Sequence, residues 1–245
     1  MTERPHAAPT AAMVLAAGLG KRMRPITDAI PKPLITVAGK TLLDWGLDSL
    51  AAAGVTKAVV NVHYLPDQII AHTAARQAPR VIISDERDQL LDSAGGIVKA
   101  RDEFAGQAFF ILNADTFWID KSESNLRRLA LAWRPQKMDI LVMLASLNQA
   151  TGHSGGADFV AEADGRLARA RGAPQGFIYA GAAIVDASLF AKAEPTPHSL
   201  NAYFDRAIAA GRLYGMQLDG HWITVGTPEA LSPAEEAVRK AELAS

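Results

Sequence analysis

Residues 13–33 read Met-Val-Leu-Ala-Ala-Gly-Leu-Gly-Lys-Arg-Met-Arg-Pro-Ile-Thr-Asp-Ala-Ile-Pro-Lys-Pro, and this stretch holds the signals that decide the fold. The apolar run 11–17 has the length of a buried strand, and Gly18 and Gly20 end it in a turn. Because glycine has no Cβ, such a turn brings backbone N–H groups close to a bound anion. Cations follow directly, at Lys21, Arg22 and Arg24. The stretch therefore predicts a strand followed by a phosphate-binding loop.

Two familiar phosphate motifs do not fit this loop. A P-loop needs a longer glycine spacing and a Ser or Thr after its lysine, whereas Arg22 follows Lys21 here. The dinucleotide fingerprint needs a third glycine where Met23 stands, which argues against an NAD-binding dehydrogenase. An ordinary turn with surface cations is the remaining alternative. Lys32 argues against it, because the prolines on either side restrict the backbone and hold this lysine in place.

The composition is that of an ordinary soluble globular protein, with 245 residues, 49% hydrophobic and 21% charged. The net charge of −1 gives no electrostatic reason to expect nucleic acid or a membrane surface as a partner. The chain has no cysteine, which excludes disulfides, thiolate zinc sites and cysteine nucleophiles. No signal peptide or membrane span is recognisable, so we expect a cytoplasmic protein with a flexible N-terminal tail over residues 1–10.

Strands and helices alternate after this tail, so residues 11–245 are expected to form a single α/β domain. The alternation predicts a doubly wound, mostly parallel, Rossmann-like sheet with helices on both faces. Residues 151–185 break the pattern with short strand-like runs, which predict a small antiparallel excursion. The expected strands are 11–17, 57–62, 80–83, 108–112, 138–145, 158–162, 167–170, 177–185 and 213–218, and the expected helices are 41–53, 66–76, 94–104, 122–133, 199–210 and 227–242.

Three turns follow expected strands and should meet at one edge of the sheet, where open α/β sheets bind their ligands. They are the glycine loop, the turn 92–96 and the turn at Asp115. A carboxylate after a strand is often only a turn cap, but beside a phosphate loop it fits a Mg²⁺ ligand, since Mg²⁺ accompanies triphosphates. In the turn 92–96, Ser93 offers a similar alternative as a helix N-cap.

At this point the sequence resembles a known family. Leu15-Ala16-Ala17-Gly18-Leu19-Gly20-Lys21-Arg22-Met23, with Pro31-Lys32-Pro33, is similar to the signature of the sugar-1-phosphate nucleotidyltransferases. Residues 151–159, Thr-Gly-His-Ser-Gly-Gly-Ala-Asp-Phe, and the turn Leu-Asp-Ser-Ala-Gly-Gly-Ile resemble the N-acetylmuramate α-1-phosphate uridylyltransferase subfamily of cell-wall recycling. The alternative for residues 151–159 is a flexible surface loop.

The resemblance implies a reaction and a set of roles. A sugar 1-phosphate would attack the α-phosphorus of UTP, with pyrophosphate leaving and Mg²⁺ as cofactor. Arg22, Lys32 and Asp115 would be catalytic, with Asp115 and the residue at Thr224 in the metal position. The nucleotide would contact Ala16, Ala17, Gly18, Gly20, Lys21, Arg22, Ala94, Gly95 and Asn113, and the sugar would contact Asp158, Gly181 and Arg171. A monomer or small homo-oligomer is expected.

The sequence departs from the family at Thr224. The family pattern His-Trp-x-Asp-x-Gly-Thr carries the second metal aspartate there, and a neutral hydroxyl is a poorer Mg²⁺ ligand. This leaves a weakly catalytic, nucleotide-binding sensor as an alternative to a full enzyme. Mannose or glucose 1-phosphate, and guanine or thymine nucleotides, are alternatives within the enzyme class. Asp219 is near in sequence but has no evident path to the site.

Overall fold

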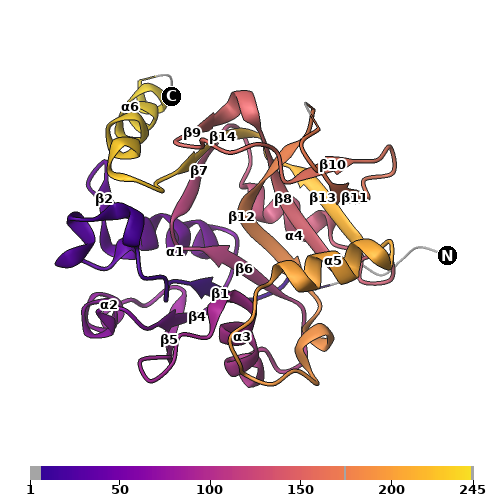
Figure 1. Ribbon diagram of the computed structural model, residues 1–245, viewed down its shortest axis with the longest axis horizontal. Helices are drawn as coiled ribbons and strands as arrows, with labels where there is room; N and C mark the ends of the chain where they lie inside the picture. The colour runs from indigo at the N-terminus through magenta and orange to yellow at the C-terminus, as the bar shows by residue number, and fades with distance from the viewer. Residues whose placement is uncertain (1–6, 174, 244–245) are drawn as a thin grey trace.

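The computed structural model describes residues 7–173 and 175–243, and a large mixed sheet runs through its centre (Figure 1). One row of paired strands joins β5 (Arg80–Asp85), β4 (Lys57–Val62), β1 (Ala11–Leu15), β6 (Phe109–Asn113), β12 (Phe177–Val185), β8 (Ile140–Ser146) and β13 (Leu213–Gln217). β12 is antiparallel to both of its long neighbours, β6 and β8, while the other neighbours in this row are parallel. The doubly wound, mostly parallel sheet is confirmed.

The excursion differs from the expectation in one respect. The strands β10 (Phe159–Ala161) and β11 (Leu167–Arg169) form the expected antiparallel pair, but residues 177–185 belong to the middle of the main sheet. That last run is antiparallel as expected and pairs with β10 at Phe177, but it also lies between β6 and β8. Its place in the main sheet was missed, because a continuous apolar run does not reveal which strands lie beside it.

Helices cover both faces of the sheet because neighbouring residues on a strand point to opposite sides. On one face of the sheet, Val14 and the strand side chains that point the same way pack against α1 (Leu42–Ala52), α2 (Pro66–Thr73) and α4 (Asn125–Ala132). On the opposite face, Met13 and the strand side chains that point the same way pack against α3 (Asp92–Lys99) and α5 (Asn201–Ala209). Among the described residues, no helix has the length and hydrophobicity needed to cross a membrane.

A second, smaller sheet was not expected. It joins β7 (Thr116–Asp120), β14 (Gly220–Thr224) and β9 (Ala150–Thr151), and α6 (Leu231–Glu242) covers it at one side of the molecule (Figure 1). Thr116 lies opposite Thr224 in this sheet, so the chain that leaves β6 at Asp115 is held by a segment more than a hundred residues further on. A hairpin of β2 (Thr36–Val37) and β3 (Lys40–Thr41) precedes α1.

The helices are mostly shorter than expected, and local bonds account for two of the ends. Thr41 caps α1, since its Oγ1 accepts a hydrogen bond from the Asp44 amide at 3.0 Å. Ser124 caps α4 in the same way, which places its start after residue 122. The expected helix 94–104 is α3 followed by the 3₁₀ helix Arg101–Phe104, and the expected helix 227–242 begins as the 3₁₀ turn Pro228–Ala230.

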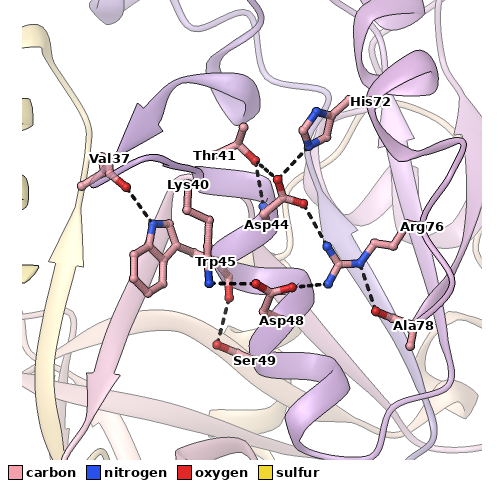
Figure 2. Close-up of polar contacts among 10 residues, drawn as sticks. All are labelled: Val37, Lys40, Thr41, Asp44, Trp45, Asp48, Ser49, His72, Arg76 and Ala78. Carbon is pink, nitrogen blue, oxygen red and sulfur yellow. Dashed lines mark hydrogen bonds and ion pairs between the residues drawn. The ribbon is translucent and has the colours of Figure 1, made fainter. Parts of the chain in front are cut away.

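A cluster of charged side chains ties α1 to the chain after α2 (Figure 2). Arg76, whose side chain is only 16% exposed, donates to Asp44 at 2.9 Å and also bonds Asp48. Lys40 reaches Asp48 at 2.8 Å, and His72 reaches Asp44 at 2.8 Å. Burial would raise the pKa of Asp48, but the hydrogen bonds and charges of Lys40 and Arg76 outweigh burial, so its pKa lies below the usual value.

Residues 1–6 of the expected flexible tail lie outside the described residues. Within the remainder of that tail, Pro9 is buried, and the Thr10 carbonyl accepts the amides of Thr56 at 2.9 Å and Lys57 at 3.3 Å. The chain is therefore joined to the sheet just before β1 begins.

Candidate active site

A pocket of about 530 Å³ opens at the carboxyl ends of β1, β4 and β6. This is the edge where parallel strands of α/β sheets present their ligand-binding loops. Six of the residues expected to bind nucleotide, phosphate or metal line it: Ala16, Ala17, Gly18, Lys32, Asn113 and Asp115. The loop after β1 and the turn after β6 therefore meet as the sequence predicted.

The glycine loop is folded back onto Lys32. Gly20 has a left-handed φ of +61°, and a Cβ there would lie 2.9 Å from Thr27 Cγ2 and 3.2 Å from Lys32 Cβ. Thr27 is buried and donates from Oγ1 to the Gly20 carbonyl at 2.9 Å. Gly18 differs, because a Cβ there would meet nothing within 4 Å. Gly20 therefore serves close packing, while Gly18 faces open space at the pocket.

Lys32 and Asp115 form an ion pair in the pocket, with Nζ 2.6 Å from Oδ2. The Lys32 side chain is 11% exposed and that of Asp115 is 35% exposed. Lys32 begins the 3₁₀ helix Lys32–Leu34, and Pro31 before it is extended, so its backbone is fixed from both sides. The two charges expected to handle phosphate and metal are thus adjacent, and the carboxylate keeps an open face.

A magnesium ion could use Asp115 together with substrate oxygens. Within the part of the chain that the structure describes, no group of three or more His, Asp or Glu side chains is placed to hold a metal by itself. Mg²⁺ in phosphate-transfer sites usually takes only one or two carboxylates, plus phosphates and water. Asp115 meets that minimum, so the donor set fits a substrate-dependent metal.

Thr224 lies where the resemblance places the second metal ligand. It ends β14 opposite Thr116, and the next amide, that of Val225, donates to the Asp115 carbonyl at 3.1 Å. Asp219 lies beyond the other end of β14, where its carboxylate accepts from Ser122 at 3.0 Å. Asp219 therefore does not replace the missing carboxylate.

Lys21 and Arg22 are exposed and do not line the pocket. Neither forms an ion pair within residues 7–173 and 175–243. The Arg22 guanidinium lies beside Gly226, with Nη1 3.6 Å from the position a Cβ would take. Because Gly226 follows the Val225 amide that bonds Asp115, Arg22 is next to the same rim of the site.

The expected turn 92–96 is instead the first part of α3. Ala94 and Gly95 are buried, and their amides donate to the His198 carbonyl at 3.0 and 3.3 Å. A Cβ on Gly95 would lie 2.3 Å from the Thr196 carbonyl, so the glycine admits protein backbone. Ser93 is not the N-cap, since α3 begins at Asp92 and the Ser93 hydroxyl accepts the Leu200 amide at 2.9 Å. From this part of the chain, the residues that line the pocket are Leu90, Asp92, Ser93 and Pro197.

A buried hydrogen-bond network at the pocket wall, which includes the lining residue Asn61, was not found from the sequence. Asn61, at the end of β4, accepts the Ala16 amide on Oδ1 at 2.8 Å and donates from Nδ2 to Glu86 at 2.8 Å. The other carboxylate oxygen of Glu86 accepts the Leu91 amide at 3.1 Å. Glu86 is 1% exposed. Burial raises its pKa, and the hydrogen bonds from Asn61 and Leu91 oppose that rise. A polar Asn inside the apolar run 57–62 was the available signal.

The expected sugar residues are not all close to the pocket. Gly181 has a φ of +79°, and a Cβ there would lie 2.3 Å from Thr116 Oγ1, so β12 passes close behind the Asp115 turn. Asp158 is exposed and accepts the Tyr179 amide at 2.8 Å. Arg171 is exposed in the turn after β11 and has no hydrogen-bond or ion-pair partner among the described residues. The structure thus places Gly181 against the site and leaves Arg171 outside the pocket.

The stretch 151–159 is anchored at its start. Thr151 pairs with Ile223 in the small sheet, and its hydroxyl lies 2.8 Å from His221 Nε2. The His153 ring meets Trp222 edge-on at 5.8 Å. These contacts exclude a free surface loop for its first three residues. Burial lowers the pKa of His221, so this histidine is neutral near pH 7.

The model of a family described as nucleotidyl transferase matches residues 11–153. The chain is 42% identical over 240 residues to the N-acetylmuramate alpha-1-phosphate uridylyltransferase of Caulobacter vibrioides, covering 96% of this chain and 99% of that protein. It is 29% identical to a probable mannose-1-phosphate guanylyltransferase 2 of Arabidopsis thaliana, covering 89% of this chain and 62% of that protein.

Solved structures agree on the fold. The inositol-1-phosphate CTP transferase from T. maritima superposes with a TM-score of 0.76 at 18% identity, covering 96% of this chain and 97% of the other. A UDP-glucose pyrophosphorylase complexed with UDP-glucose gives a TM-score of 0.75 at 16% identity, covering 95% and 99%.

Proposed function

Because the chain belongs to the nucleotidyl transferase family, we propose that it transfers a uridylyl group from UTP to N-acetylmuramate α-1-phosphate and releases pyrophosphate. The observation that carries this choice is the 42% identity to the Caulobacter uridylyltransferase over 99% of that protein. The product would be a UDP-sugar, and the reaction would serve cell-wall recycling in the cytoplasm.

The proposed reaction does not require a general base. The attacking phosphate is already ionised near neutral pH, since its second pKa is about 6. Catalysis then consists of aligning two polyanions and offsetting their charge. A bound Mg²⁺ would supply positive charge to the phosphates at Asp115, and the chain's own residues do the rest.

Lys32 is the residue best placed to act on both phosphates. Its ammonium is already in the pocket, held to Asp115 at 2.6 Å, and its stem is largely buried. When a triphosphate enters, phosphate oxygens would share this cation with the carboxylate. Arg22 would approach from the rim beside Gly226 and grip the triphosphate with its planar guanidinium. The pocket walls at Ala16, Ala17 and Gly18 would hold the nucleoside.

Two alternatives have an observation behind them. The similarity to the Arabidopsis protein supports a mannose-1-phosphate guanylyltransferase. Thr224 in place of the second metal aspartate supports a weakly catalytic nucleotide sensor.

The test is pyrophosphate release with Mg²⁺ and each pairing of UTP, GTP or dTTP with N-acetylmuramate, mannose or glucose 1-phosphate. We expect strong turnover with UTP and the muramate phosphate. Turnover with another pair would replace the proposed substrates. Binding of UTP without turnover in any pairing would support the sensor.

A further inference from the structure

A buried network of three hydrogen bonds runs from Ala16 to Leu91 and joins two loops through Asn61 of β4. The Ala16 amide donates to Asn61, the Asn61 amide donates to Glu86, and the Leu91 amide donates to Glu86. Ala16 opens the glycine loop and Leu91 precedes α3, so the network connects the two sides of the nucleotide pocket. Asn61 and Glu86 are 2% and 1% exposed, so water does not compete with these bonds.

The bond to Ala16 fixes the direction in which the glycine loop leaves the sheet. On one side of the Leu15–Ala16 peptide, the Leu15 carbonyl accepts the Ala114 amide at 3.2 Å. On the other side, the Ala16 amide finds no strand backbone and bonds the Asn61 side chain instead. A single peptide plane is thereby held from both neighbouring strands. The residues that line the pocket next, Ala17 and Gly18, start from this fixed plane.

Glu86 decides which way the Asn61 amide faces. Both carboxylate oxygens accept N–H groups, so only the Nδ2 end of Asn61 can face Glu86, and Oδ1 is left for Ala16. Helix α3 closes over this pair at Gly96, where a Cβ would lie 2.6 Å from Glu86 Oε1 and 2.7 Å from Asn61 Nδ2. We propose that Glu86 is a positioning residue for nucleotide binding, which acts through Asn61 and Leu91 to fix both walls of the nucleotide pocket. This inference rests on the proposed function.

In the wild-type network, three N–H groups are matched by three acceptor oxygens. Glu86→Gln replaces one acceptor by a donor, so one buried N–H is unpaired whichever way the amides turn. Asn61→Asp sets two buried carboxylates against each other. In the double variant the new carboxylate at position 61 accepts from Ala16 and from the new amide, whose oxygen accepts from Leu91. All three bonds are then restored, with the negative charge moved from position 86 to position 61.

The experiment compares these three variants with the wild type and with Asn125→Asp. Asn125 is also fully buried and also donates to a carboxylate, that of Asp120 at 2.6 Å, but it belongs to α4 and does not line the pocket. The measurements are KM for UTP, KM for the sugar phosphate, kcat, UTP affinity by calorimetry, and hydrogen exchange at the Ala16 amide.

We expect each single variant to raise KM for UTP by about tenfold or more, with little change in KM for the sugar phosphate. The Ala16 amide should exchange faster in both single variants, and the double variant should restore most of both properties. Asn125→Asp should change thermal stability but not KM. The proposal is overturned if the single variants bind UTP normally, or if the double variant is as impaired as the two changes added together.

Failure of the proposed function gives a different pattern. If the wild type turns over no substrate pair, the proposed function is wrong. Calorimetry with the triphosphates and hydrogen exchange at the Ala16 amide still test the network in that case. Equal exchange at Ala16 in all variants would overturn the inference by itself. If both single variants fail to fold, the double variant remains informative because its donors and acceptors are matched.

Discussion

Replacing Gly181 with alanine should damage both stability and the position of Asp115. Gly181 has a φ of +79°, which costs an alanine about 1–2 kcal/mol. The new Cβ would also lie 2.3 Å from Thr116 Oγ1, and Thr116 is held in β7 directly after Asp115. Overpacking of this kind costs about 1–3 kcal/mol. The sum is a loss of about 2–5 kcal/mol in the free energy of unfolding.

Gly39→Ala is the matched control. Gly39 has a nearly equal φ of +76°, but a Cβ there meets nothing within 4 Å. This variant should lose only the conformational part, about 1–2 kcal/mol. Urea denaturation gives both values. In thermal scans, Gly181→Ala should lower Tm by about 4–20 °C, at 2–4 °C per kcal/mol for a chain of this size.

A second change separates the contact from the backbone strain. Adding Thr116→Ala to Gly181→Ala removes the oxygen that the Cβ meets, so about half of the lost stability should return. Pyrophosphate release should fall in Gly181→Ala, because Asp115 moves with Thr116, and should be unchanged in Gly39→Ala. The reasoning is refuted if Gly181→Ala is no less stable than Gly39→Ala, or if Thr116→Ala brings no recovery.

Three other predictions concern the metal site and the charged cluster of Figure 2. Thr224→Asp should lower the Mg²⁺ concentration needed for half-maximal rate, because it sets a second carboxylate near Asp115; an unchanged Mg²⁺ titration would place Thr224 outside the metal site. Arg76→Met should cost about 1–3 kcal/mol in urea denaturation, since it leaves Asp44 and Asp48 without their largely buried partner, and a loss below about 0.5 kcal/mol would mean that the pairs behave as exposed ones. The pKa of Asp48 in the folded protein is below its ordinary value of 3.8, so ionised Asp48 stabilises the fold above about pH 4, and this stabilisation is lost as the pH falls below that value. The difference in the free energy of unfolding between wild type and Asp48→Asn should therefore shrink as the pH falls, and a constant difference would contradict the assignment.

Local sequence signals predicted the main sheet and the meeting of the loop after β1 with the turn after β6. The run before Gly18, the proline-flanked Lys32 and the carboxylate after β6 each carry their own local signature, and the fold brings them to one pocket. Such features are readable because the residues that determine them are neighbours in the chain.

The features that sequence reasoning missed depend on distant partners. The strand β7 was not expected, because its partner β14 follows about a hundred residues later and neither run alternates cleanly. Gly95 was expected to face a nucleobase, but its partner is the Thr196 carbonyl, which the local sequence does not reveal. The role of Glu86 was also not predictable from local sequence, since it depends on a hydrogen bond from Asn61 in β4. A glycine or a buried carboxylate in the sequence suggests a close contact, but only the folded structure shows which group makes that contact.

The pairing of β7 with β14 also bears on how the protein is made. Asp120 meets Gly220 and Thr116 meets Thr224, so the partners are separated by 100 and 108 residues. At a synthesis rate of about 5–20 residues per second, β7 emerges from the ribosome about 5–20 s before β14 does. During that interval Phe117 and Trp118, buried in the finished protein, have no β14 to pack beside them. The nascent chain therefore carries an open strand edge with aromatic side chains, the kind of segment that chaperones bind, until the C-terminal quarter has been translated.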